Sequence, residues 1–406
     1  MSTALQSSMT DRVDTGSAVA WKGKLQHSKP RLLLLLNDDA YFRVHRLQHA
    51  RAARNAGMEV LVCTRADDDG KWIKDEGFTY LPIPFVKEGR QPLQELLGVF
   101  KLAKLYRQEK PDIVHHLCMK PILYGSSAAR LAGIPAVVNT FTGLGFVFMK
   151  NGWRSRVLRA ALVPSLRWAF GHPNCRAVFE NSADRERLIY AKIVRRERTL
   201  IISGTGVDIG KFMPMAEEEE TPIVVLACRM LWDKGVADFV EAARLLKKQN
   251  VAVRCVLVGT PDPGSPTSIS EERLLSWQQE RVVEWWGYRE DMPRILRSAH
   301  VVVLPSFYEG LPTILLEACA SARPVVTTAI PGCQAVVRDG ENGFLVPVKD
   351  PGALARAIKV LLENPALRTR MGTRGREIVV REFSLGRVTK QVITVYRELL
   401  DNVCSV

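Results

Sequence analysis

Two glutamates, Glu309 and Glu317, mark the ends of the stretch of sequence whose residues are best suited to chemistry. Glu317 lies inside "TILLEACASA", which carries no other charge before Arg323. Burying a lone carboxylate costs roughly several kcal/mol unless hydrogen-bond donors surround it. A vicinal diol such as a ribose offers two donors to one carboxylate, and backbone amides or an arginine of the chain itself are the alternative partners.

The segment between these glutamates predicts an anion site. An apolar strand ends at "HVVVLPS", and we expect the next helix to begin at Pro312, where a missing N–H costs nothing. Gly310 allows close approach of backbone to a ligand, and the first amides of a helix bind anions. The residues predicted to line this site are Gly310, Leu311, Pro312, Thr313 and Ile314.

Two cations follow another apolar strand in "ACRMLWDKG", at Arg229 and Lys234. Two positive charges in one loop suit a diphosphate, because both can neutralise its oxygens. The alternative is two solvated loop charges. A third stretch, "WWGYREDMP", follows a further strand, and its aromatic and backbone groups, Tyr288 among them, are candidates to hold a base.

These candidates belong to an alternation of strands and helices that is typical of parallel sheets covered on both faces. The alternation stops at "GTGVDIGKFMPMAEEEETP", which predicts an exposed connection, and then starts again. The fold class predicted is α/β, with two doubly wound domains whose ligands lie at the carboxyl ends of the strands. The predicted parts are a flexible tail (1–30), a first domain (31–204), a connection (205–220), a second domain (221–385) and a final amphipathic helix (386–406).

Length and composition agree with this organisation. A chain of 406 residues with 47% hydrophobic and 25% charged residues is typical of a globular protein of two domains. No apolar run approaches the roughly 18 residues of a membrane-spanning helix. The eight cysteines form no Cys-x-x-Cys pair, so we interpret them as reduced core residues and expect neither disulfides nor a zinc site.

The net charge of +14 is distributed unevenly. The first 200 residues carry 32 Lys and Arg against 18 Asp and Glu, and the remaining 206 residues carry 25 of each. A basic half can face nucleic acid, an anionic membrane or an acidic substrate, or form a merely soluble surface. The segment 148–172 interleaves tryptophans with arginines, which suits a helix at a lipid headgroup region or one packed on the domain core.

The Glu-x7-Glu spacing with "EGLP", the Arg-x4-Lys-Gly pattern at Arg229 and "NGFLV" at 342–346 together carry a resemblance. They resemble the signature of the retaining GT-B glycosyltransferases of family four. The first half is similar to a branch that builds bacterial glycans on polyprenyl diphosphate, through "VHHLCMKPILYGSSAARLAGIPAVVNTFTGLGFVF", "FEN" and "GTGVD". The resemblance extends over about residues 31 to 385.

The resemblance implies roles for these residues. Arg229 and Lys234 would bind the donor diphosphate and stabilise the leaving nucleoside diphosphate, Glu317 would bind the ribose, and Glu309 the transferred sugar. It also implies retention of the anomeric configuration without a metal or other cofactor. Such chemistry depends on electrostatic stabilisation more than on a protein nucleophile.

The acceptor residues implied for the first domain are less specific, because the sequence departs from the wider family there. No Gly-Gly loop follows the first strand, and the usual His-x-His is replaced by "HHLC". Either His115 or His116 would orient a sugar, and His116 is also a catalytic candidate. The alternative for each histidine is that it only packs at the end of the strand. The other acceptor residues expected are Lys120, in the loop after this strand, Thr140 and Thr142.

The resulting hypothesis is an enzyme that moves N-acetylhexosamine from a UDP-sugar to a polyprenyl-diphosphate-linked saccharide. It would be cytoplasmic and peripheral on the inner face of the membrane, contacting it through the basic first domain. The alternatives are a GT-B enzyme with another donor or a soluble acceptor, a sugar-nucleotide epimerase and, on charge alone, a nucleic-acid-binding protein. No nucleic-acid recognition motif is present, so we expect no such partner.

Overall fold

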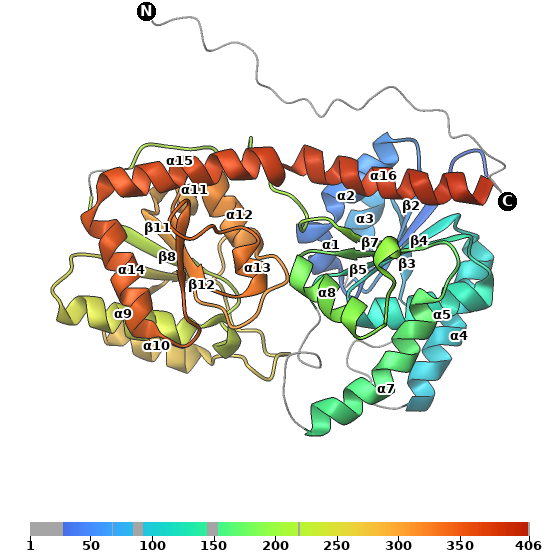
Figure 1. The fold of residues 1–406 in the computed structure, drawn as a ribbon, viewed down its shortest axis with the longest axis horizontal. Helices are drawn as coiled ribbons and strands as arrows, with labels where there is room; N and C mark the ends of the chain where they lie inside the picture. Colours follow the sequence, from blue (N-terminus) through green and yellow to red (C-terminus); the bar gives the residue numbers. More distant parts are fainter. Residues whose placement is uncertain (1–26, 67, 84–91, 144–152, 218–219, 405–406) are drawn as a thin grey trace, which may run out of the picture. The chain divides into compact units, whose positions relative to one another are not determined.

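The structure is a computed structural model that describes residues 27–66, 68–83, 92–143, 153–217 and 220–404. The described residues form two compact units. Of the described residues, those up to Thr205 and those from Val388 onward form the first unit, and Gly206–Arg387 form the second. Each unit is an α/β structure built on one parallel sheet (Figure 1).

The first unit has seven parallel strands in the order β3-β2-β1-β4-β5-β6-β7. Strand order therefore reverses between β1 and β4, where ligands of such sheets commonly bind. The strands are β1 Arg31–Leu35, β2 Glu59–Thr64, β3 Thr79–Pro82, β4 Ile113–Leu117, β5 Ala136–Phe141, β6 Cys175–Phe179 and β7 Thr199–Ile201. The helices are α1 Asp39–His45, α2 Leu47–Asn55, α3 Lys71–Asp75, α4 Pro92–Glu109, α5 Met119–Ala132, α7 Trp153–Phe170, α8 Ser182–Tyr190 and α16 Leu385–Cys404, with a 3-10 turn at Arg196–Arg198.

The leucine run in β1 shows why the sheet is buried on both faces. Alternate side chains of a strand point to opposite faces. Leu32 and Leu34 accordingly join one apolar core with α2 and α16, whereas Leu33 and Leu35 join a second core with α4, α5 and α7. A strand covered on both sides needs apolar residues at every position, which the sequence supplies.

The last helix, α16, completes the first unit although it comes from the end of the chain (Figure 1). Its buried residues Val388, Val392 and Leu399 lie in the core that contains Leu34. The side-chain amide of Asn174 donates a hydrogen bond to the Leu399 carbonyl at 2.8 Å. The predicted amphipathic helix at this end of the chain therefore exists and has its apolar face against the first sheet.

The second unit repeats the architecture with six parallel strands in the order β10-β9-β8-β11-β12-β13. The strands are β8 Ile223–Ala227, β9 Arg254–Val258, β10 Glu284–Trp285, β11 Val301–Leu304, β12 Val325–Thr328 and β13 Gly343–Val346. The helices are α9 Val236–Lys248, α10 Glu271–Gln279, α11 Met292–Ser298, α12 Thr313–Ala320, α13 Pro331–Gln334, α14 Pro351–Glu363 and α15 Pro365–Glu382, with a 3-10 turn at Trp232–Lys234. The predicted fold class, with two doubly wound α/β domains, is confirmed.

The connection before β8 is more firmly held than its composition predicts. Val207 and Phe212 are buried in the core of the second unit, so the expectation of an exposed connection is wrong there. Arginines of the second unit bind this segment: Arg323 donates to the Met215 carbonyl at 2.9 Å, and Arg376 donates to that of Phe212 at 2.6 Å. Hydrogen bonds to charged donors are stronger than neutral ones, so these contacts fix the segment to its unit.

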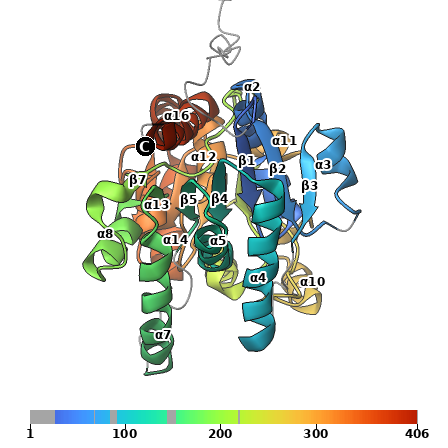
Figure 2. The ribbon, with the colours of Figure 1, turned by 90° about the vertical axis from the view of Figure 1, so that its right-hand side faces the viewer.

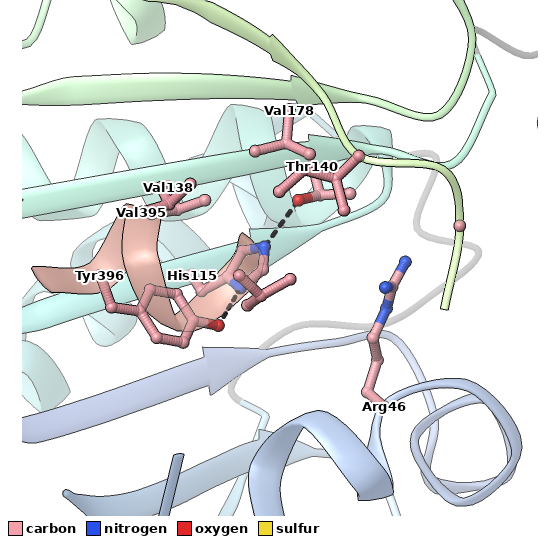
Figure 3. A pocket seen from close by; sticks show the side chains of 10 residues that line it. Arg46, His115, Val138, Thr140, Val178, Val395 and Tyr396 are labelled. Carbon is pink, nitrogen blue, oxygen red and sulfur yellow. Dashed lines mark hydrogen bonds between the residues drawn. The ribbon is translucent and has the colours of Figure 1, made fainter. Parts of the chain in front are cut away.

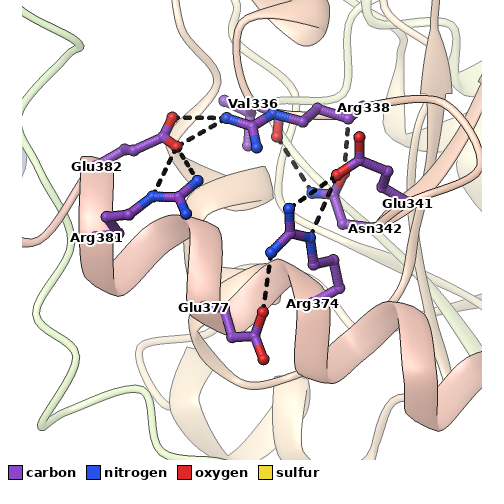
Figure 4. Close-up of polar contacts among 8 residues, drawn as sticks. All are labelled: Val336, Arg338, Glu341, Asn342, Arg374, Glu377, Arg381 and Glu382. Carbon is purple, nitrogen blue, oxygen red and sulfur yellow. Dashed lines mark hydrogen bonds and ion pairs between the residues drawn. The ribbon is translucent and has the colours of Figure 1, made fainter.

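The "NGFLV" motif has a structural explanation in this unit (Figure 4). Asn342 is fully buried, accepts a hydrogen bond from the Arg338 amide at 2.7 Å and donates one to the Val336 carbonyl at 3.2 Å. These bonds close the turn that leads into β13. Ion pairs then join the turn to α15, from Arg338 to Glu382 at 2.8 Å and from Arg374 to Glu341 at 3.2 Å (Figure 4).

Candidate functional site

The site in the second unit is built where the neighbouring strands β8 and β11 end. The loop after β11 is tied to the loop after β8 because the Phe307 amide donates to the Asp233 carbonyl at 2.9 Å. The Ser306 hydroxyl donates to the same carbonyl at 3.3 Å. Side chains from both loops are therefore held together at the carboxyl edge of this sheet, as the strand pattern predicts.

Two glycines let these loops approach the strands closely. Gly235 has φ +71°, and a Cβ there would lie 2.1 Å from the Pro305 carbonyl oxygen. Gly259 has φ +132°, and its Cβ would lie 1.9 Å from the Cys228 carbonyl oxygen. Side chains do not fit at either position, so the glycine of the Lys-Gly pair is required for the loop to seat Lys234 beside β11.

Lys234 and Glu309 form the centre of the site. Lys234 Nζ lies 2.6 Å from Glu309 Oε1, and the two side chains are only 16% and 13% exposed. Pairing compensates part of the cost of burying each charge. Their proximity confirms that the two loops meet, and it places a cation suited to phosphate next to a carboxylate suited to hydroxyl groups.

Arg229 is more exposed than Lys234 and is also paired. Its side chain is 63% exposed, and its Nη1 lies 2.6 Å from Asp262 Oδ2 in the loop after β9. Asp262 was not predicted as part of the site, because only its place after the neighbouring strand brings it near Arg229. Exposed pairs contribute little to stability, so an incoming anion can displace this carboxylate at small cost.

The helix α12 begins one residue later than predicted, at Thr313, and Pro312 is its N-cap. No described side chain caps this end of the helix. Amides of the first turn lack partners within a helix and carry its positive dipole end. Gly310, Leu311 and Pro312 are buried at this end, whereas Thr313 and Ile314 are half-buried.

Glu317 lies one turn further along α12 and is also half-buried. Burial raises the pKa of its carboxyl to about 7, although the positive charge of Lys211 opposes the shift. Among the residues that the structure describes, none makes a hydrogen bond or ion pair with this carboxylate. Neither of the alternative partners, a backbone amide or an arginine, is found there. Tyr288, on the loop after β10, is 68% exposed.

In the first unit, neighbouring histidines of β4 point to opposite faces of the sheet. His116 is fully buried on the side of α4 and α5. It lies 3.1 Å from the Tyr106 hydroxyl and 2.7 Å from Asn139 Oδ1. Burial lowers the pKa of His116 to about 4, so the ring is neutral. The polar atoms of His116 are thus used within the core, and the catalytic and acceptor-binding roles predicted for it stay predictions.

His115 occupies the other face, in a pocket with Thr140 and Tyr396 (Figure 3). Its Nδ1 lies 2.7 Å from the Tyr396 hydroxyl and its Nε2 lies 2.7 Å from Thr140 Oγ1. Burial holds the pKa of His115 well below its usual range. The pocket encloses about 10 Å³, room for one water. Both ring nitrogens of His115 are thus engaged by side chains of the chain itself, and its contact with an acceptor stays a prediction.

A buried ion pair lies at the edge of this pocket. Arg46, at the break between α1 and α2, lies 3.3 Å from Glu180, and the two side chains are 4% and 8% exposed. Arg46 also donates to the Tyr41 hydroxyl at 3.1 Å. No sequence signal distinguishes Arg46 from any other charged residue of an amphipathic helix, whereas Glu180 belongs to the "FEN" stretch.

The remaining acceptor candidates lie close to the end of β4. Lys120 is in the first turn of α5 and not in a loop as predicted, with its Nζ 5.3 Å from the centre of the Tyr124 ring. Thr142 Oγ1 lies 3.3 Å from Cys118 Sγ. Both residues are half-buried. Their contact with an acceptor stays a prediction.

The arginine-rich segment 148–172 lies partly outside the described residues. Within α7, Phe170 is buried in the core and Trp168 is 42% exposed. Arg167 donates to the Ala191 carbonyl at 3.0 Å. The described part of this helix therefore packs on its own unit. No described helix is long and apolar enough to cross a membrane, and the described residues contain no cluster of three metal-binding side chains.

Comparison with known proteins agrees with the two-unit organisation. Residues 221–364 match the family of glycosyl transferases group 1, and residues 31–170 match the family glycosyl transferase 4-like. The chain is similar to the N,N'-diacetylbacillosaminyl-diphospho-undecaprenol alpha-1,3-N-acetylgalactosaminyltransferase of Campylobacter jejuni, with 26% identity over 373 residues, 88% of this chain and 96% of the relative. It is also similar to the UDP-Gal:alpha-D-GlcNAc-diphosphoundecaprenol alpha-1,3-galactosyltransferase of Escherichia coli, with 24% identity over 84% of this chain and 89% of the relative.

Solved structures show the same fold. A glycosyltransferase from Rickettsia africae has a TM-score of 0.74 and 17% identity, with 93% of this chain and 100% of the other covered. The Anabaena protein Alr3699/HepE, solved with UDP and glucose, has a TM-score of 0.72 and 19% identity, with 90% of this chain and 98% of the other covered.

Proposed function

Because the chain belongs to the family-four glycosyltransferases and has their GT-B architecture, we propose that it transfers a sugar to a polyprenyl-diphosphate-linked saccharide. The proposed donor is a UDP-N-acetylhexosamine, and the proposed outcome is retention of the anomeric configuration. The second unit binds the nucleotide-sugar and the first unit binds the acceptor.

The observation that carries the donor assignment is the carboxylate of Glu317. It lies one turn inside α12, its pKa is raised to about 7 by burial, and it has no partner among the described residues. A ribose diol supplies the two donors that it lacks. The diphosphate then extends toward the N-terminus of α12 and Lys234, with Arg229 beside it, and Glu309 accepts hydroxyl hydrogens of the sugar.

The proposed reaction breaks the bond between the anomeric carbon and the diphosphate oxygen. A bond from that carbon to the acceptor hydroxyl oxygen forms on the same face, and the hydroxyl proton passes to the departing phosphate. Negative charge grows on the nucleoside diphosphate as the bond breaks. Lys234 and Arg229 and the amides of α12 stabilise that charge, which lowers the barrier without a protein nucleophile.

The lipid-linked acceptor is supported by two relatives, whose names specify saccharides on undecaprenol diphosphate. The basic first half of the chain suits a diphosphate acceptor and an anionic membrane surface. His115, Lys120, Thr140 and Thr142 are the proposed acceptor residues. We further propose that the protein acts as a peripheral protein at the inner face of the cytoplasmic membrane.

A donor screen tests this function. The purified protein is incubated with radiolabelled UDP-GlcNAc, UDP-GalNAc, UDP-galactose, UDP-glucose or GDP-mannose and a polyprenyl-diphosphate-linked saccharide. Label from one UDP-N-acetylhexosamine should enter the organic-extractable lipid, and NMR of the product should show an α-linkage. Transfer only to soluble sugars, or from no donor in the set, would reject the proposal.

A further inference from the structure

Three large apolar side chains lie exposed at one end of α4. Leu96, Leu97 and Phe100 are 54%, 57% and 54% exposed, and they are called the α4 apolar patch below. The opposite side of the same helix is buried, with Leu102 and Tyr106 in the core. Single exposed apolar residues are ordinary, whereas three neighbours on one helix surface indicate a contact surface.

The position of the patch suits contact with a large flat partner. The C-terminal end of α4 is attached to the sheet, where Arg31 forms an ion pair with Glu109 at 3.3 Å. The other end of the helix projects from the first unit beside the projecting end of α7 in both views (Figures 1 and 2). The patch therefore lies on the part of the helix that projects from the unit.

Charges next to the patch indicate the chemistry of that partner. Lys101 and Lys104 follow within one turn of Phe100 and are exposed. Apolar side chains that insert between headgroups, with lysines beside them for anionic phosphates, are the features of a helix that lies in a membrane interface.

We infer that the α4 apolar patch and its two lysines are the surface by which the first unit lies on an anionic bilayer. In the described part of the arginine-rich helix α7, Phe170 is buried and Arg167 bonds to backbone carbonyls of its own unit, so these two side chains are not available for such a surface. The inference deepens the proposed function and rests on it, since a lipid-linked acceptor is presented at a bilayer surface.

Vesicle flotation of the full chain tests the surface. The vesicles contain either phosphatidylglycerol with phosphatidylethanolamine or zwitterionic phosphatidylcholine alone, without acceptor. The double variants Leu97→Glu/Phe100→Glu and Lys101→Glu/Lys104→Glu should each lower the fraction bound to anionic vesicles on the order of tenfold. The matched control is Tyr190→Glu, which changes a 91% exposed aromatic residue of α8 in the same unit and should bind like the parent protein.

Three results would overturn the inference. Equal flotation of the parent protein and both double variants would reject the surface. A large fall in thermal unfolding temperature in the Leu97→Glu/Phe100→Glu variant would show that the chain itself covers the patch. A dimer that the same substitutions dissociate, measured by light scattering, would assign the patch to a second copy.

Transfer to a short-chain, water-soluble polyprenyl-diphosphate saccharide separates this inference from the proposed function. If the proposed function and the membrane surface on α4 are both correct, the α4 variants retain full transfer to the soluble acceptor. They lose transfer to the acceptor in vesicles. If the parent protein transfers to neither acceptor, the proposed function fails, and flotation alone then decides whether the patch binds membranes.

Discussion

The polar groups of the two units differ in how completely the chain satisfies them. In the second unit, Glu317 has no described partner, and the exposed side chain of Arg229 is paired with the half-buried carboxylate of Asp262. In the first unit, both nitrogens of His115 are already engaged, by Tyr396 and Thr140, around a volume that holds one water. The proposed donor side thus leaves charged groups available to a ligand, whereas the polar atoms of His115 on the proposed acceptor side are already engaged by the chain.

This difference predicts that substitutions in the second unit affect transfer most. Lys234→Ala removes a cation beside the leaving diphosphate, so we expect kcat/KM to fall by about 10² to 10³. The control Lys349→Ala removes an exposed cation near Phe307 in the same unit and should leave transfer almost unchanged. Circular dichroism verifies folding, and parental activity in Lys234→Ala would show that the site is misplaced.

Glu317→Gln separates ligand binding from stability. The UDP dissociation constant should rise at least tenfold by calorimetry, because the neutral amide accepts ribose hydrogens less well. The variant should nevertheless unfold at a higher temperature than the parent at pH 8. Burial raises the carboxyl pKa above its unfolded value, so its ionisation lowers the free energy of unfolding as pH rises from about 4.5 through 7, by up to about 3 kcal/mol.

Below pH 4.5 the parent protein and the Glu317→Gln variant both carry an uncharged side chain at position 317. The stability advantage of the variant should therefore disappear. Glu377→Gln, at an exposed position of α15, controls for loss of a surface charge. A stability difference between parent and Glu317→Gln that does not change with pH would contradict the assigned pKa.

The two histidines of β4 provide a smaller and more selective comparison. His115→Gln should raise KM for the acceptor several-fold to about tenfold without changing that for the donor, because His115 borders the proposed acceptor face. His116→Gln should instead lower the free energy of unfolding by about 1 to 3 kcal/mol, since it leaves buried partners unsatisfied. The reverse assignment of the two effects, by steady-state kinetics and urea unfolding, would reject this division of roles.

The smallest effect is expected from metal removal. The proposed mechanism assigns the diphosphate charge to Lys234, Arg229 and the amides of α12, so EDTA in excess should change the transfer rate less than twofold. Loss of activity that Mg²⁺ or Mn²⁺ restores would show that a cation shares this task.

The sequence was most informative where function depends on short loops after adjacent strands. Arg229, Lys234 and Glu309 could be associated because each follows an apolar strand, and parallel strands bring their carboxyl ends together. Glu317 could be recognised because a charge in an apolar helix requires a partner. These signals are local, and the structure brings Lys234 and Glu309 within 2.6 Å.

Other features depended on contacts that sequence patterns do not contain. Strand alternation predicts that His115 and His116 face opposite ways, but not which face is covered by α16. Tyr396 lies 281 residues from His115, and Asp262 lies 33 residues from Arg229, so neither contact follows from spacing. Lys120 was assigned to the loop that follows the strand, whereas here Lys120 and the proline after it lie in the first turn of α5.

The return of α16 to the first unit also determines the order in which the chain can fold during synthesis. The second unit is continuous from Gly206 to Arg387 and can fold as soon as that stretch has left the ribosome. The first sheet, although made earlier, lacks part of the cover over Leu32 and Leu34 until Val392 and Leu399 have been synthesised. The domain that is synthesised first is therefore completed last, and a chain cut short after Arg387 would expose the part of the first sheet's apolar face that α16 covers.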